Sequence, residues 1–230
     1  MSRTRRIIFG VVALGALLAI AGFTYIWVTG GSGQASGAIA APTLAVESTG
    51  GDPVVFDIVP EESEARFLID EEMFGNPRTV IGRTDQIAGQ ILINFDNPAA
   101  SELGTVRVNL RTIVTDSEMR NRAIRGQILQ SNDFEFAEFV PSSIEGLPES
   151  ITLNNSYTFN VIGNLTVRDV TKPATFEARV TPISEDRLHG FASTTVQRTD
   201  FGLTIPNAPG IANVGEEVTL ELEFVAQAAE

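Results

Sequence analysis

The stretch Gly163-Asn-Leu-Thr-Val-Arg-Asp-Val-Thr-Lys-Pro173 reads as one strand ending and the next beginning. Leu165–Val167 has strand-forming residues, and the polar pair Arg168-Asp169 follows before the chain resumes ahead of a proline that cannot donate to a sheet. Apolar and polar residues alternate over 157–161 upstream and 174–180 downstream. Because successive side chains of a strand point to opposite faces, this alternation predicts two strands with one buried face each. An antiparallel sheet with a single apolar side follows.

The same period of two continues along residues 54–227. It is clearest near the end, where Val218, Leu220, Leu222 and Phe224 share one face and polar residues share the other. Many short strands with polar turns and almost no helix predict an all-β fold. This pattern leaves an antiparallel barrel and a sandwich both open.

One segment interrupts the strands. Residues 117–128 are expected to form a short helix, because Asp116 or Ser117 can cap its first turn. Its surface is basic, and two interpretations remain. The helix is either solvated and paired with neighbouring carboxylates, or a lid at the barrel mouth whose positive charge attracts an anionic lipid head group.

The N-terminal region predicts membrane attachment. Residues 7–28 contain no charge over 22 positions and would form a helix about 33 Å long, enough to cross a bilayer. The basic tail 1–6 precedes this segment and no Lys or Arg follows until Arg66, which predicts a single-pass protein of the cell membrane with a cytoplasmic N-terminus. A cleaved signal peptide is the alternative, and both interpretations place the remaining chain outside the cytoplasm, in the periplasm or at the cell surface. Residues 29–53, rich in Gly, Ser, Ala and Pro, predict a flexible linker to the domain at 54–227.

Composition excludes several classes of function. The chain has no cysteine and a single histidine, His189, which argues against disulfides, a Ser-His-Asp triad and a zinc site with several histidines. The formal net charge of −13 and the single lysine, Lys172, oppose binding to nucleic acid. We expect no metal, no cofactor and no enzymatic activity.

The opening stretch also resembles the signature of the YceI-like family of extracytoplasmic lipid- and polyisoprenoid-binding proteins. Further matching segments occur in the family's order and span about residues 54–227: Ser63-x-Ala-x-Phe67, Gly82 and Gly89, Arg125–Leu129 followed by Asp133-Phe134, and Arg198-x-Asp-Phe-Gly202. The resemblance implies an antiparallel, lipocalin-like β-barrel of about eight strands, with the helix of residues 117–128 over one end. It also implies a structural turn at residues 198–202, with Phe201 buried.

Two acidic positions depart from the family pattern. Many members have histidine where this chain has Glu62 and Glu71, so any interaction made by those histidines is in doubt here. Both glutamates belong to acidic clusters, residues 61–64 and 70–72, that lack the spacing of a calcium loop. Their sequence context predicts solvated loop charges.

The remaining candidate site is the apolar face of the strands. It forms either a filled core or the wall of a cavity for one small ligand, and eight strands allow both. The resemblance favours a membrane-tethered binding protein that holds or carries a polyisoprenoid, an isoprenoid quinone or another long-chain lipid. The alternative is a filled-barrel structural or protein-interaction domain. The predicted ligand-binding residues are Phe67, Ile69, Ile91, Ile93, Val106, Val108, Leu110, Tyr157, Phe159, Phe176, Val218, Leu220 and Phe224.

Overall fold

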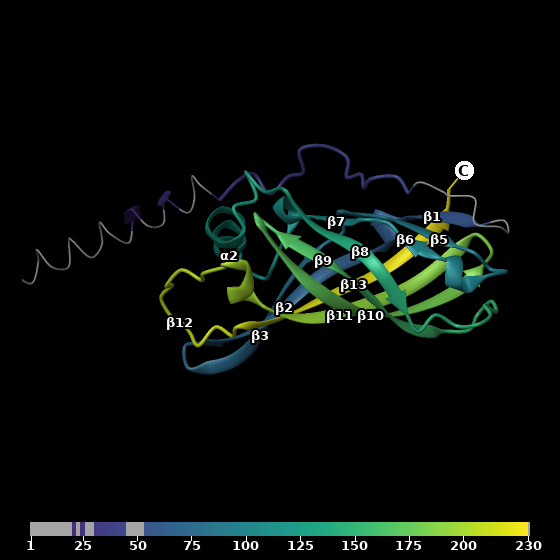
Figure 1. Ribbon diagram of the computed structural model, residues 1–230. Coiled ribbons are helices and arrows are strands. Elements are labelled where there is room, and N and C mark those ends of the chain that lie inside the picture. The colour runs from purple at the N-terminus through teal and green to yellow at the C-terminus, as the bar shows by residue number, and fades with distance from the viewer. Residues whose placement is uncertain (1–19, 22–23, 26–29, 45–52, 230) are drawn as a thin grey trace, which may run out of the picture.

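The computed structural model describes residues 20–21, 24–25, 30–44 and 53–229, and one antiparallel sheet dominates it (Figure 1). The strands are β1 (Val54–Ile58), β2 (Glu64–Met73), β3 (Asn76–Thr84), β4 (Ile87–Ala88), β5 (Gln90–Ile93), β6 (Glu102–Leu103), β7 (Val106–Asn109), β8 (Phe136–Glu145), β9 (Tyr157–Val167), β10 (Val170–Ser184), β11 (Arg187–Gln197), β12 (Ile211–Ala212) and β13 (Glu217–Ala228). The helical elements are α2 (Glu118–Ala123), the π-helical turn η4 (Ile124–Ile128) and the 3-10 turns η1 (Pro60–Glu62), η2 (Pro98–Ala100), η3 (Leu110–Thr112) and η5 (Arg198–Phe201).

The prediction of about eight strands is wrong, because the sheet contains thirteen within the described residues. The difference arises where long strands are interrupted without leaving the sheet. The turn η1 separates β1 from β2, yet both pair with β13. Only Gly89 separates β4 from β5, which pair with β7 and β6. Hydrophobic alternation continues across such breaks, so it cannot count them.

The sheet curls until its two ends meet. Its order runs β4-β7-β8-β9-β10-β11-β13-β1-β5-β6, with β2 and β3 attached to β13. Because β4 and β5 follow each other in the chain, the first strand of this order is covalently joined to the β5–β6 end. The inward faces therefore surround a common interior, and the predicted all-β antiparallel barrel is present.

The stretch 163–173 folds as predicted. β9 and β10 form a hairpin in which Val167 pairs with Val170, and Arg168-Asp169 is the two-residue turn. Arg168 has a φ of 59°, which a two-residue hairpin turn requires. Pro173 is tolerated because the pairing of β10 with β11 begins only at Glu177, so no partner on that side needs its missing N–H.

The predicted helix over residues 117–128 is confirmed as α2 followed by η4. The Ser117 hydroxyl caps it by accepting a hydrogen bond from the Arg120 backbone N–H at 3.5 Å. Figure 1 shows α2 at one end of the barrel, beside the loop that carries β12. The turn at η5 is confirmed as well, since Phe201 is buried and Gly202 has a φ of 64°.

The predicted transmembrane helix is wrong for the residues that the structure describes. Among them, no helix has the length and hydropathy needed to cross a membrane. Of the predicted span at 7–28, the structure describes only residues 20–21 and 24–25, and the remainder lies outside the described residues.

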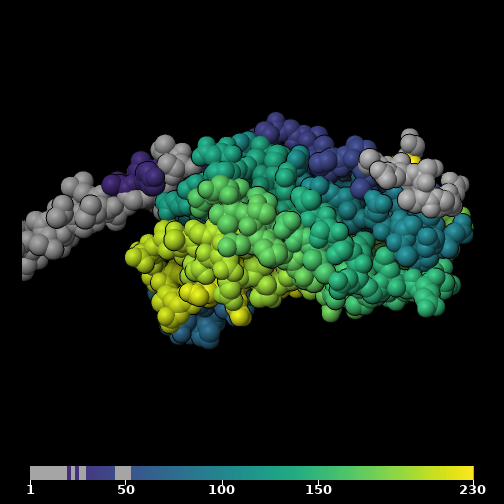
Figure 2. Space-filling view, in the orientation of Figure 1, coloured from purple at the N-terminus to yellow at the C-terminus, as the bar shows by residue number. Residues whose placement is uncertain are grey.

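Residues 30–44, here named the N-terminal strap, lie along the outside of the barrel. Figures 1 and 2 show the strap as the dark purple-to-blue segment on the upper surface, and it was expected to belong to a flexible linker. Its two ends contact Arg125 beside α2 and Gln90 in β5. The hydrogen bonds are Arg125 Nε to Gly30 O at 3.2 Å, Ser36 N to Glu135 Oε1 at 2.8 Å, Arg107 Nη1 to Ala40 O at 2.9 Å, and Leu44 N to Gln90 Oε1 at 2.7 Å.

Candidate functional site

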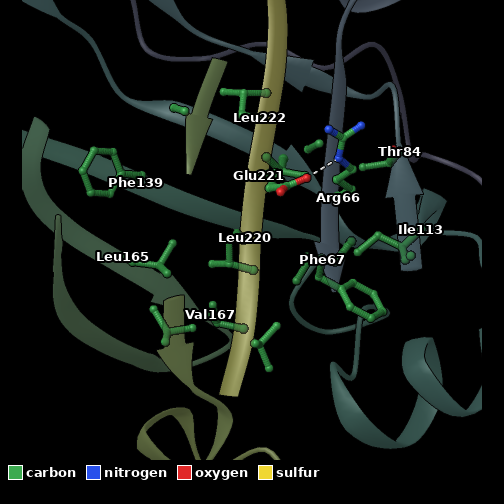
Figure 3. Close-up of a pocket in the computed structure, with 18 of the residues that line it drawn as sticks. Arg66, Phe67, Thr84, Ile113, Phe139, Leu165, Val167, Leu220, Glu221 and Leu222 are labelled. Atoms are coloured by element: carbon green, nitrogen blue, oxygen red, sulfur yellow. Dashed lines mark hydrogen bonds and ion pairs between the residues drawn. The ribbon is translucent and has the colours of Figure 1, made fainter. Parts of the chain in front are cut away.

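The barrel encloses a cavity of about 740 Å³, within the size range of small-molecule sites in proteins. Its wall is mainly apolar and combines three parts of the fold: the inward faces of the strands, the helix α2 with η4, and the loop 203–214. Figure 3 shows part of this wall around β13, with Leu220 and Leu222 on that strand, Phe67 on the neighbouring β2, and Phe139 and Leu165 on β8 and β9. The side chains of the barrel therefore do not fill its interior.

Strand alternation decides which side chains reach the cavity. On β13, Leu220, Leu222 and Phe224 line it. β2 is in register with β13 so that Phe67 pairs with Leu220. Ile69 follows on the same face of β2, because side chains two residues apart point the same way. The apolar wall is thus assembled from period-two positions of strands that are distant in sequence.

All thirteen residues predicted for ligand binding line the cavity. They come from β2, β5, β7, η3, β9, β10 and β13, which the curled sheet brings around one space. Their contact with a ligand stays a prediction. Several lining residues were not predicted, because they follow the turn η3 or lie on the helix or in the loop 203–214, where no extended period-two pattern exists: Ile113, Ile124, Ile128, Leu203, Ile205 and Ile211.

The prediction of a solvated loop charge is wrong for Glu71. β2 continues to Met73, so Glu71 occupies an inward position two residues after Ile69 and lines the cavity. Only 6% of its side chain is exposed. Glu62 matches the expectation better, since its side chain is 48% exposed in an ion pair with Arg187. The alternation of inward and outward positions continues along β2 through the acidic cluster 70–72, and this is the signal that was missed.

Glu71 belongs to a set of four charged side chains, named here the Glu71 network: Glu71, Arg78, Asp116 and Arg120. Arg120 Nη2 lies 2.8 Å from Glu71 Oε1, and the other end of its guanidinium binds Asp116. Arg78 Nη2 lies 2.5 Å from Asp116 Oδ2, and its Nε is 3.8 Å from Glu71. The network fastens α2 to the β2–β3 hairpin and contains two positive and two negative groups.

The other arginines of the helix are paired too. Arg122 and Arg125 each lie 3.2 Å from Glu118 Oε1. The structure therefore favours the interpretation in which the basic helix is balanced by neighbouring carboxylates, and not the one in which it presents a free positive patch. His189 lies away from this end, half exposed on β11 and 3.7 Å from Glu223. The described residues contain no group of three or more His, Asp or Glu side chains that could hold a metal ion.

The Glu71 network makes the free energy of unfolding depend on pH. The hydrogen bond from Arg78, and then the charge of Arg120, lower the pKa of Asp116 below its usual 3.8. A carboxylate with a lowered folded-state pKa stabilises the fold above its unfolded pKa, and this contribution is lost as the pH falls through the folded value. Wild type should therefore lose part of its free energy of unfolding below about pH 4, as Asp116 becomes protonated. The Asp116→Asn variant should lack this part of the loss, which we expect to be less than about 1 kcal/mol because Asp116 is exposed.

Urea unfolding between pH 2 and 7 measures this difference. The matched control is Asp57→Asn, because the Asp57 carboxylate accepts a hydrogen bond from the Gln90 amide and not from an arginine. Equal acid profiles for wild type and Asp116→Asn would show that Asp116 does not link folding to protonation.

The model of the YceI-like domain matches residues 56–226, which is most of the chain. The chain belongs to the YceI-like domain family. The resemblance noted in the sequence is therefore confirmed, and the match runs from within β1 to within β13.

Known proteins resemble this chain in sequence or in fold. A UPF0312 protein of Shewanella sp. (strain ANA-3) is 27% identical over 148 residues, covering 62% of this chain and 73% of that protein. A polyisoprenoid binding domain from Saccharophagus degradans superposes with a TM-score of 0.61 at 13% identity, covering 76% of this chain and 99% of that one. BcnA of Burkholderia cenocepacia gives 0.59 at 17% identity, covering 74% and 99%. At these identities the two structures share the fold.

Proposed function

We propose that this chain is a binding protein that holds one long-chain apolar lipid of the polyisoprenoid class in its barrel. The observation that carries the proposal is the cavity of about 740 Å³ with its mainly apolar wall. Membership of the YceI-like family supports it, as does the shared fold with a polyisoprenoid binding domain. No reaction is needed for such a role. The extracytoplasmic location expected from the N-terminal charge order stays a prediction.

Burial of apolar surface would supply the affinity. Each CH₂ group moved out of water contributes about 0.8 kcal/mol, so a dozen contribute about 10 kcal/mol before the costs of association and ordering are subtracted. The wall offers apolar side chains from the strands, the helix and the loop 203–214, and the strand pairing keeps backbone polar groups hydrogen-bonded within the sheet. Affinity would therefore rise with chain length until the cavity is full.

We expect Leu220→Trp to weaken lipid binding at least about tenfold, because the indole would occupy cavity volume that an isoprenoid chain needs. The matched control is Thr219→Trp. It adds the same indole one residue earlier on β13, at a position that does not belong to the cavity wall. Native mass spectrometry of the full-length protein, with organic extraction and then titration with a polyprenol and an isoprenoid quinone, measures occupancy and affinity.

The outcome decides between the binding protein and its alternative. A stoichiometric isoprenoid or fatty-acyl mass that is lost in Leu220→Trp and kept in Thr219→Trp supports the proposal. If the wild-type protein arrives empty and takes up neither added lipid, the carrier function is overturned, and a structural or protein-interaction domain becomes the better account. Thermal unfolding of both variants shows whether either result reflects a damaged fold.

A further inference from the structure

Glu71 is an ionisable side chain at an inward position of the barrel. Glu71 follows Phe67 and Ile69 at alternate positions of β2, so the strand pattern would place an apolar residue there. Burying a carboxylate is costly unless a partner charge and hydrogen bonds replace its water. Arg120 supplies that partner at 2.8 Å, reaching over from α2. The pair therefore puts hydrogen-bonding groups into an otherwise apolar wall.

Both members of this pair face the cavity. Glu71 and Arg120 line it, and their side chains are 6% and 16% exposed. Ser117 and Gln127 line the same end. A lipid whose chain fills the apolar part has one polar end, and that end is best placed where donors and acceptors are already held in position.

Charge balance restricts which polar end fits. The charged residues that line the cavity are three arginines and four glutamates: Arg66, Arg120, Arg198, Glu71, Glu102, Glu138 and Glu221. Their formal sum is −1. Glu138 pairs with Arg107, which lies outside this set, and Glu71 pairs with Arg120, so these charges are balanced in pairs. A phosphate or diphosphate would add negative charge beside the buried Glu71 carboxylate, which repels it.

The arginines at this end already have partners. Arg120 and Arg78 are engaged within the Glu71 network. Arg198 donates its Nε to the Gly215 carbonyl and its Nη1 to the Leu203 carbonyl, both at 2.9 Å, and so holds the loop 203–214 in place. An anionic head would have to displace a carboxylate to gain one of these cations. An uncharged hydroxyl or carbonyl can accept from Arg120, and a hydroxyl can also donate to Glu71.

We propose that the Glu71–Arg120 pair is the subsite for the polar end of the lipid, and that it takes an uncharged hydroxyl or carbonyl in preference to a phosphate ester. The inference rests on the proposed function and narrows its ligand to the class of polyprenols and isoprenoid quinones. Glu71 then sets head-group specificity.

The test compares lipids of one chain length that differ only at the head. Decaprenol, a decaprenyl quinone, decaprenyl monophosphate and decaprenyl diphosphate are titrated into the full-length protein in one detergent, with dissociation constants read by native mass spectrometry. In wild type we expect decaprenol and the quinone to bind at least about tenfold more tightly than the monophosphate. The diphosphate should be the weakest ligand.

Two variants locate the discrimination. Glu71→Gln keeps the side-chain shape but removes one carboxylate, so the affinity ratio of alcohol to monophosphate should fall about tenfold. Glu223→Gln is the matched control, since it removes the same charge from the exterior of β13, where Glu223 lies 3.8 Å from Arg66. Its ratio should equal that of wild type.

Each result has a distinct meaning. Monophosphate binding as tight as decaprenol binding in wild type overturns the inference and leaves the proposed function standing. A ratio unchanged by Glu71→Gln, in a variant that still binds decaprenol, overturns the role of Glu71. Failure of all four lipids to bind wild type overturns the proposed function, and the subsite with it. The wild-type comparison needs no variant, so it decides even if Glu71→Gln does not fold.

Discussion

Phe56→Ala is expected to lower the free energy of unfolding by about 3–5 kcal/mol. Phe56 is completely buried on β1, where it pairs with Ala228 of β13 on one side and Ile91 of β5 on the other. Removing the ring leaves a void at the place where the two ends of the sheet come together. Neighbours held in register by ladders on both sides have little freedom to fill it.

Equilibrium unfolding in urea, with the slope of each transition checked, measures this loss. The matched control is Val55→Ala on the same strand, because Val55 is only partly buried and should cost less than about 1 kcal/mol. If Phe56→Ala costs no more than the control, the closure of the barrel does not depend on packing at β1.

Gly163→Ala is expected to cost about 3 kcal/mol, at the upper end for overpacking by a single methyl group. A Cβ at Gly163 would lie 2.5 Å from the carbonyl oxygen of Val140 and 2.7 Å from the Phe139 ring. The ring could turn, but the carbonyl belongs to β8, whose ladder with β9 would have to shift. This close approach explains why the stretch that begins at Gly163 opens with glycine.

Gly37→Ala is the matched control, because a Cβ there meets no atom within 4 Å. Thermal and urea unfolding of the two variants should give a large loss for Gly163→Ala and almost none for Gly37→Ala. Similar stabilities would mean that β8 and β9 can separate locally without weakening the sheet.

The sequence predicts the wall of the cavity better than its shape. Alternation identifies the inward residues because it depends only on local strand geometry, and Phe67, Phe159 and Leu220 line the cavity as expected. Whether the interior is filled depends on how far the sheet curls and how the strands are staggered, which no local pattern contains. The thirteen strands were missed for a similar reason, since η1 and Gly89 interrupt long strands without changing their alternation.

The polar part of the candidate site could not be predicted from one strand. Glu71 is flanked by Asp70 and Glu72, so the three acids read as one solvated group, although only the middle one points inward. Its partner Arg120 is 49 residues away, on a helix whose position over the barrel end is a tertiary property. The pairing that makes a buried carboxylate tolerable is therefore visible only once the fold has closed.

The pairing of β13 has a consequence for synthesis. This strand pairs with β11, β1 and β2, so these three strands have an open edge until residues 217–228 have been made. At about 5–20 residues per second, a ribosome needs roughly 8–30 s for the stretch from β1 to β13. During that interval the nascent chain has unpaired strand edges, which can pair with other chains and cause aggregation. The barrel can close only after nearly all of it has been translated.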